Sequence, residues 1–233
     1  MAGKCLAVIT ARGGSKRIPR KNIKLFCGKP IIAYSIEAAQ KSGIFDEIMV
    51  STEDEEIAEI AKDLGAKVPF LRSEKNSDDM AMTHEVVMEV LGQYQELGIH
   101  FDSVCCIYPT APFLTGEKLR EGMELLEQTQ ADGVVPVVRF SFPPQRCFVI
   151  EDGKVQYKWP ENRLKRSQDL EAFYHDCGQF YLLRVQPFLE EESLILKHTV
   201  PVFMDDLEVQ DIDTIEDWKI AEVKYRLLRE KGE

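Results

Sequence analysis

Acidic residues are absent from the first 36 positions of a chain that is otherwise acidic. The 233 residues include 40 Asp or Glu and 29 Lys or Arg, giving a formal net charge of −11, but the segment from Met1 to Ile36 contains only basic charges. A positive patch on an acidic protein favours a small polyanionic ligand, because the rest of the surface repels the long phosphate backbone of a nucleic acid. We therefore expect no nucleic-acid partner.

Long apolar runs and paired cysteine motifs are lacking as well. No stretch approaches the roughly 20 apolar residues that span a bilayer, and the chain starts without the basic and apolar regions of a secretory leader. These features predict a cytoplasmic protein with no membrane partner. The six cysteines form no C-x-x-C pair, so free buried thiols are expected instead of a zinc site or disulfides.

Two familiar phosphate-binding motifs are also missing, the Walker A pattern G-x-x-x-x-G-K-[ST] and the dinucleotide pattern G-x-G-x-x-G. In their place a basic loop, Ala11–Asn22, follows the apolar run Cys5–Ile9, which is typical of a buried strand. Its residues Gly13 and Gly14 permit close approach of the backbone to a ligand, and Arg12 can grip a phosphate through its planar fork. The alternative is a solvated connecting loop, but the lack of nearby acids favours a phosphate site.

Strand-like and helix-like patterns alternate through the first 138 residues. Strands are expected at 4–10, 46–51, 67–71, 104–108 and 133–138, and helices at 30–42, 53–64, 83–97 and 116–128. We expect Thr52 and Thr83 to cap the second and third helices. This alternation predicts an α/β fold with a mostly parallel sheet. Because ligands bind at the carboxyl ends of the strands in such sheets, the basic loop, residues 51–52, Arg72 and the loop 109–115 should share one edge.

The pattern changes after residue 138. Three prolines interrupt the segment 140–176, and the turn 151–154 predicts a hairpin between strands at 148–150 and 155–157. We interpret 140–176 as an inserted oligomerisation arm, and residues 1–139 and 177–233 as the core. The core is expected to resume with strands at 178–183 and 200–204 and to end with a helix at 215–229.

Two carboxylates near the C-terminus, Asp211 and Asp213, form a D-x-D pattern. On an extended strand both would point to one face, and paired carboxylates suit a Mg²⁺ ion that also binds phosphate oxygens. The alternative is that they only cap the helix that follows. Two interpretations are also open for His175 and Asp176, which could serve as general base and substrate ligand or could make structural hydrogen bonds and a turn.

In this order along the chain, these motifs resemble the nonulosonic-acid cytidylyltransferases, which make CMP-activated acidic sugars such as CMP-sialic acid. The segments that carry the resemblance are the basic loop with Gly28-Lys29-Pro30, Val50-Ser51-Thr52, Arg72 with Ser77-Asp78, Pro109-Thr110-Ala111-Pro112 and Asp211-Ile212-Asp213-Thr214. Nearly the whole chain is covered. Segments 107–114, 166–170 and 174–176 resemble the branch that activates pseudaminic acid, because Tyr108 stands where the sialic acid branch commonly has Gln and His175 where it usually has Arg.

The resemblance implies a three-layer, Rossmann-like nucleotide-diphospho-sugar transferase fold and the transfer of CMP from CTP to an acidic nine-carbon sugar, with release of pyrophosphate and with Mg²⁺ as cofactor. It implies that Ala11, Arg12, Gly13, Gly14, Ser15, Lys21, Asn22, Arg72 and Ser77 bind CTP, with Arg12 and Lys21 on the triphosphate and Asn22 and Arg72 at the cytosine. It implies a sugar pocket with Tyr108, Thr110, Gln168, His175 and Asp176. Asp211 and Asp213 would bind the metal and, with Arg12 and Lys21, would be the catalytic residues.

The resemblance also implies that the arm forms a homodimer. The alternatives are synthesis of CMP-sialic, CMP-legionaminic or CMP-3-deoxy-octulosonic acid, a glycosyltransferase on a similar sheet, and a non-catalytic CTP sensor.

Overall fold

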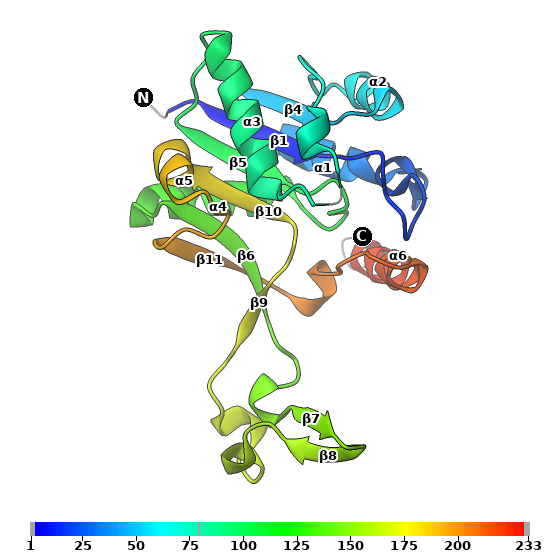
Figure 1. Cartoon of the computed structure of the whole chain (residues 1–233), viewed down its shortest axis with the longest axis vertical. Coiled ribbons are helices and arrows are strands. Elements are labelled where there is room, and N and C mark those ends of the chain that lie inside the picture. Colours follow the sequence, from blue (N-terminus) through cyan, green and yellow to red (C-terminus); the bar gives the residue numbers. More distant parts are fainter. Residues whose placement is uncertain (1–2, 79, 231–233) are drawn as a thin grey trace.

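A computed structural model describes residues 3–78 and 80–230, which form an α/β core and a projecting arm (Figure 1). The sheet order is β11 (Thr199–Met204), β6 (Gly133–Arg139), β10 (Phe180–Arg184), β5 (Ser103–Ile107), β1 (Cys5–Thr10) and β4 (Glu47–Ser51), with β9 (Tyr174–Asp176) paired to β6. The pairs β1–β4, β1–β5 and β6–β11 are parallel, whereas β10 runs antiparallel to both of its neighbours. The predicted mostly parallel sheet is therefore confirmed.

Helices cover both faces of this sheet, as the alternation of side chains along β1 requires. Cys5, Ala7 and Ile9 pack with α1 (Ile31–Ser42), α2 (Glu55–Asp63) and α4 (Gly116–Thr129), while Leu6 and Val8 pack with α3 (Thr83–Glu96) and α5 (Val185–Glu191). All five side chains are at most 1% exposed. The resulting arrangement of helix, sheet and helix is the predicted three-layer fold.

The last helix, α6 (Ile215–Glu230), lies outside these layers and packs against the start of the chain. Its Trp218 and Tyr225 contact Phe26 edge to face, with ring centroids 5.5 and 5.6 Å apart. Phe26 belongs to a two-stranded ribbon of β2 (Leu25–Phe26) and β3 (Lys29–Pro30) that directly follows the basic loop. The C-terminal segment is thereby held next to that loop.

The arm leaves the core after β6 and returns through β9, and it carries the hairpin of β7 (Phe148–Glu151) and β8 (Lys154–Tyr157) far from the sheet (Figure 1). The predicted hairpin is confirmed. Its turn residues Asp152 and Gly153 both have positive φ, 50° and 73°, as expected for the Asp-Gly pair of a tight hairpin turn. The arm boundaries 140–176 stay a prediction, and Tyr174–Asp176 pair with β6 in the central sheet.

Several local expectations were wrong. The predicted strand 67–71 reduces to a single bridge from Lys67 to Met49, because Pro69 has no N–H to donate to a neighbouring strand. Asp54, not Thr52, caps α2 by accepting a hydrogen bond from the Ile57 N–H (3.0 Å).

Two more expectations failed further along the chain. Thr83 lies inside α3, and Met82 occupies the cap position. The segment Asp211–Asp213 is not a strand but an irregular stretch before α6. Among the described residues, no helix combines the length and apolar character needed to cross a membrane.

Candidate active site

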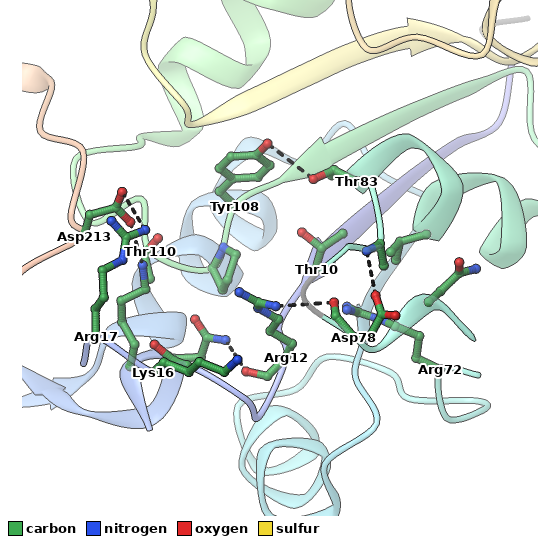
Figure 2. Close-up of a pocket in the computed structure, with 17 residues that line it drawn as sticks. Thr10, Arg12, Lys16, Arg17, Arg72, Asp78, Thr83, Tyr108, Thr110 and Asp213 are labelled. Carbon is green, nitrogen blue, oxygen red and sulfur yellow. Dashed lines mark hydrogen bonds and ion pairs between the residues drawn. The ribbon is translucent and has the colours of Figure 1, made fainter. Parts of the chain in front are cut away.

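A cavity of about 600 Å³ opens at the carboxyl ends of β1 and β5 (Figure 2). Its described lining comes from the basic loop, the segment 72–86, the loop after β5 and the approach to α6. The lining residues are Thr10, Arg12, Ser15, Lys16, Arg17, Lys21, Asn22, Arg72, Asn76, Asp78, Ala81, Thr83, Val86, Tyr108, Pro109, Thr110 and Asp213. The predicted shared edge is thus present, and four cations of the basic loop line it.

The two ends of the chain meet in this cavity. Lys21 donates a hydrogen bond from Nζ to the carbonyl of Ile212 (2.7 Å), and its Nζ lies 3.6 Å from Asp213 Oδ1. Arg17 Nη2 lies 2.9 Å from Asp213 Oδ2. The early cationic loop and the late carboxylate therefore face each other, as a site that holds both a triphosphate and its counter-ion requires.

The carboxylates of the D-x-D pattern differ in their surroundings. Asp213 lines the cavity, whereas the exposed Asp211 is outside the lining of that cavity in the described chain. Partial burial raises the pKa of the Asp211 carboxyl, the charge of Asp213 raises it further, and Lys21 opposes the shift. Asp217 fixes the segment by accepting hydrogen bonds from the N–H groups of Asp213 (3.1 Å) and Thr214 (2.8 Å). Within residues 3–78 and 80–230, no cluster of three or more His, Cys, Asp or Glu could hold a metal alone.

The proposed cytosine readers are both buried at the cavity wall. Asn22 donates from Nδ2 to the Arg12 carbonyl (2.8 Å), so its amide also braces the basic loop. Arg72 donates to the hydroxyl of Ser51 from Nε (3.0 Å) and to the Ser51 carbonyl from Nη2. Burial lowers the pKa of the Arg72 guanidinium, and the charge of Glu53 opposes that effect.

Glu89 of α3 holds the segment that follows Arg72. Its carboxylate accepts hydrogen bonds from the Ser73 N–H (2.8 Å), the Ser73 hydroxyl (2.7 Å) and the Asn76 amide. Ser77 donates its hydroxyl to the Ser73 carbonyl (2.6 Å) and is outside the described lining of the cavity. Asn76 and Thr83 do line it, although the sequence carries no motif that marks them.

The glycines of the basic loop do not line the cavity in the part of the chain that the structure describes. The Gly13 N–H donates to Glu53 Oε1 (2.7 Å), on the side of the loop next to α2. Ala11 is buried and donates its N–H to the Ser51 carbonyl (3.0 Å), which continues the pairing of β1 with β4. Ser15 does line the cavity. The side chains of the loop, more than its glycine backbone, therefore face the space where a ligand fits.

The residues implied for the sugar pocket fall into two groups. Tyr108 and Thr110 line the large cavity, and the tyrosine hydroxyl lies 3.4 Å from the Thr83 hydroxyl. Gln168, in contrast, lines a second cavity of about 490 Å³ between the arm and the ends of β6 and β11. Within the described part of one chain, the five residues do not all line the same cavity.

His175 and Asp176 lie on β9, between these two groups. The Asp176 carboxylate accepts hydrogen bonds from the Gly178 N–H (2.7 Å) and from the Tyr181 hydroxyl. The Tyr181 ring lies against that of Tyr108, with centroids 5.6 Å apart. His175 packs on Phe140 at 4.7 Å between ring centroids, and its Nδ1 lies 2.9 Å from the Asp176 carbonyl oxygen. Sequence reasoning missed Tyr181, which appears there only as one residue of an apolar strand.

Comparisons with known proteins identify the family of this chain. Residues 6–223 match the profile of the cytidylyltransferase family. The chain is 43% identical over 230 residues to a pseudaminic acid cytidylyltransferase of Campylobacter jejuni, covering 98% of this chain and 99% of that enzyme. It is 37% identical to a CMP-N,N'-diacetyllegionaminic acid synthase of Legionella pneumophila, covering 97% and 98% of the two chains.

The fold is shared with more distant enzymes. The solved structure of a CMP:2-keto-3-deoxy-manno-octonic acid synthetase complexed with CTP superposes with a TM-score of 0.68 at 18% identity, covering 97% of this chain and 99% of that one. A 4-diphosphocytidyl-2C-methyl-D-erythritol synthase from Anaerococcus prevotii superposes with a TM-score of 0.62. Because the family profile and the C. jejuni relative each cover nearly the whole chain, this protein belongs to the cytidylyltransferase family of nucleotidyltransferases.

Proposed function

We propose that the chain transfers CMP from CTP to pseudaminic acid and releases pyrophosphate. The observation that carries this proposal is the 43% identity to a pseudaminic acid cytidylyltransferase along the full length of both chains. The cavity supports it, because cations of the basic loop and the carboxylate of Asp213 face the same space. Tyr108, which distinguishes this chain from the sialic acid branch, lines that space as well.

In this reaction the anomeric hydroxyl oxygen of the sugar attacks the α-phosphorus of CTP. A new P–O bond forms, the bond from the α-phosphorus to the bridging oxygen breaks, and pyrophosphate leaves with the electron pair. The hydroxyl proton passes to a nearby oxygen base. Most of the rate enhancement of such a step comes from positioning and from charge stabilisation. Arg12 and Lys21 would neutralise the leaving pyrophosphate, and Asn22 with Arg72 would hold the cytosine.

The donor set of Asp211 and Asp213 fits a magnesium ion. Two carboxylates provide hard oxygen ligands, and phosphate oxygens and water complete the octahedron that Mg²⁺ prefers. Partial burial raises the pKa of Asp211, and the nearby charge of Asp213 raises it further, so the two carboxylates are close enough to interact. When bound, the ion would supply Lewis-acid stabilisation of the phosphate charge. Arg17 and Lys21 would keep Asp213 oriented toward the cavity.

We further propose that the active form is a homodimer in which the arm of one copy completes the sugar pocket of the other. The separation of Gln168 from Tyr108 into two cavities supports this, because a second chain can supply the missing side. The arm also exposes large apolar side chains, among them Leu164 (86% exposed) and Ile150 (75%), and such projecting apolar surface is typical of an interface.

Pyrophosphate release tests the reaction and its substrates together. CTP, Mg²⁺ and pseudaminic acid should give turnover, whereas sialic, legionaminic and 3-deoxy-octulosonic acids should give much less, as should ATP, GTP or UTP in place of CTP. Preference for another acid would overturn the sugar assignment. Binding of CTP without pyrophosphate release on any acid would identify a non-catalytic sensor.

Light scattering on the purified chain tests the dimer. Leu164→Asp and Ile150→Asp should each shift the mass from dimer to monomer and lower turnover on the sugar. The matched control Ile195→Asp, at a half-exposed position of the core, should leave the mass unchanged. A monomeric wild-type chain with full turnover would refute the proposal.

A further inference from the structure

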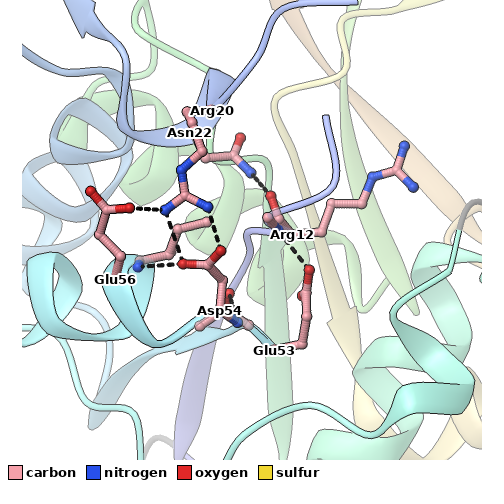
Figure 3. A network of polar contacts seen from close by, with 9 residues as sticks. Arg12, Arg20, Asn22, Glu53, Asp54 and Glu56 are labelled. Carbon is pink, nitrogen blue, oxygen red and sulfur yellow. Dashed lines mark hydrogen bonds and ion pairs between the residues drawn. The ribbon is translucent and has the colours of Figure 1, made fainter. Parts of the chain in front are cut away.

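Three carboxylates at the start of α2, those of Glu53, Asp54 and Glu56, contact the basic loop (Figure 3). Glu53 Oε1 accepts the hydrogen bond from the Gly13 N–H (2.7 Å). The Asp54 carboxylate accepts hydrogen bonds from both terminal nitrogens of Arg20, with 3.0 Å between Nη2 and Oδ1. The Glu56 carboxylate also accepts a hydrogen bond from Arg20. None of these acids belongs to the described lining of the large cavity, so they contact the loop from outside that cavity.

The backbone of the loop is shaped to meet this helix. Arg20 has φ of 55°, in the left-handed region that few residues other than glycine adopt. The resulting cost is offset by the bidentate pair with Asp54, the strongest geometry for an arginine and a carboxylate. Gly13 lies so close to Asp54 that a Cβ there would stand 2.5 Å from Oδ2. The same carboxylate thus engages both ends of the glycine-bearing segment.

The contacts with α2 oppose the electrostatic repulsion between the cations of the basic loop. Residues 12–24 carry six cations and no acid, and like charges on one short loop drive it toward open conformations. Arg20 is drawn to α2, while Arg12, Lys16, Arg17 and Lys21 line the cavity. Asp54 is the N-cap of α2 and Glu56 lies in its first turn, where negative charge is favourable, and Asp54 is additionally fixed by the Ile57 N–H.

We propose that Asp54 and Glu53 are positioning residues for catalysis: they hold the phosphate-binding loop, Asp54 through Arg20 and Glu53 through the Gly13 N–H, in the conformation that accepts the triphosphate. Neither residue belongs to the described lining of the large cavity. The proposal rests on the proposed function in so far as the loop binds CTP. If the role of Asp54 were purely structural, a neutral replacement would change the stability of the fold but not the conformation of the loop. In a positioning role, the same replacement would change the loop and the affinity for CTP.

Asp54→Asn separates these roles, because asparagine remains a good helix cap but loses the charge that pairs with Arg20. If one loop conformation in ten remains competent, the apparent affinity for CTP falls about tenfold. We expect the KM for CTP to rise by about that factor while kcat changes little, because the bound loop is the same. Glu37→Gln is the matched control, since Glu37 also pairs with two cations, Lys29 and Lys41, but on α1 outside the cavity.

Trypsin cleavage without nucleotide reports on the loop independently of any reaction. Cleavage after Arg12, Lys16, Arg17 or Lys21, located by mass spectrometry, should be several-fold faster in Asp54→Asn than in the wild type or in Glu37→Gln. If wild-type protein fails to turn over CTP but the cleavage pattern holds, the proposed function fails and the positioning role stands. Unchanged cleavage together with an unchanged KM would overturn the positioning role.

A second variant keeps the test decisive if Asp54→Asn folds poorly. Arg20→Gln removes the pair with Asp54 from the loop side, together with the pair to Glu56, and the cap of α2 remains intact. Both single variants should show faster cleavage and a raised KM, and the double variant should be no worse than Arg20→Gln alone, because that variant already removes the contact of Arg20 with Asp54. Effects that multiply in the double variant would show that Asp54 and Arg20 act separately and would refute the mechanism.

Discussion

Replacing Gly13 by alanine should damage the protein, whereas the same replacement at Gly14 should be tolerated. A Cβ on Gly13 would stand 2.5 Å from Asp54 Oδ2 and 3.1 Å from its Cβ and Cγ, about 1 Å inside ordinary contact distance. Asp54 cannot move freely, because it is bonded to the Ile57 N–H and to Arg20. We expect a loss of about 1–3 kcal/mol in the free energy of unfolding, or roughly 2–10 °C in Tm for a chain of this length.

Gly14 provides the internal control, since no described atom lies within 4 Å of a Cβ placed there. Gly14→Ala should change stability by less than about 0.5 kcal/mol. Circular dichroism melts of both variants, read beside the KM for CTP, measure the effect. In an Asp54→Ala background, Gly13→Ala should cost less than in the wild type, because the clashing oxygens are gone. If Gly13→Ala melts with the wild type, or Gly14→Ala is the worse variant, the close packing of the loop on α2 is refuted.

Three further predictions concern single carboxylates. Asp213→Asn should lower kcat for pyrophosphate release by about 100-fold or more, with little change in Tm, since exposed ion pairs such as Arg17–Asp213 contribute under about 1 kcal/mol; near-normal kcat would contradict its role. Arg20 holds the pKa of Asp54 below its usual 3.8, so the stability that Asp54 provides is present above that pH and lost as the pH falls through the lower folded value. Urea unfolding from pH 7 downward should therefore show Asp54→Asn converging on the wild type in acid. The pKa of Asp211 is raised by burial and by Asp213, so its charge costs stability once the pH exceeds that value. Asp211→Asn should unfold at higher urea than the wild type at pH 7 without Mg²⁺, and an equal or lower midpoint would count against this reasoning.

The layers of the fold could be predicted because they follow from short-range patterns. The alternation of Cys5–Ile9 between two helical layers is a direct consequence of period two in a strand that is buried on both faces. The basic loop could be predicted for a different reason, since eight cations and no acid in the first 36 residues are unusual in an acidic chain. Its proximity to Asp213 was inferred from the ligand that both would need, and the short distances from Arg17 and Lys21 to that carboxylate confirm the proximity.

The sequence could not predict the cap of α2, the end of the strand near Pro69 or the place of Gln168, because each depends on contacts made only in the folded chain. Thr52 and Asp54 are both good helix caps, but in the folded chain Asp54 accepts the hydrogen bond from the Ile57 N–H while Thr52 accepts one from the Asp54 N–H. Pro69 ends a strand that its apolar neighbours favour, because the cost of a missing N–H depends on whether a partner strand is present. The place of Gln168 depends on the course of an arm that leaves large apolar residues such as Leu164 and Ile150 exposed, so local patterns carry no information about it.

The cations of the basic loop divide into two sets with different tasks, and the division follows from their partners. Arg20 pairs with acids at the start of α2 that do not belong to the described lining of the cavity, and the Asp54 side chain in this bidentate contact is only 20% exposed. Arg17 pairs with Asp213 in the cavity itself, where its own side chain is 66% exposed, so water and salt screen that contact. In the proposed reaction, a triphosphate would compete with the Arg17–Asp213 contact, which costs little to replace. Arg20 would then anchor the loop on the protein side while Arg17 holds it weakly on the cavity side, so that binding of CTP would exchange one set of anionic oxygens for another without remaking the loop.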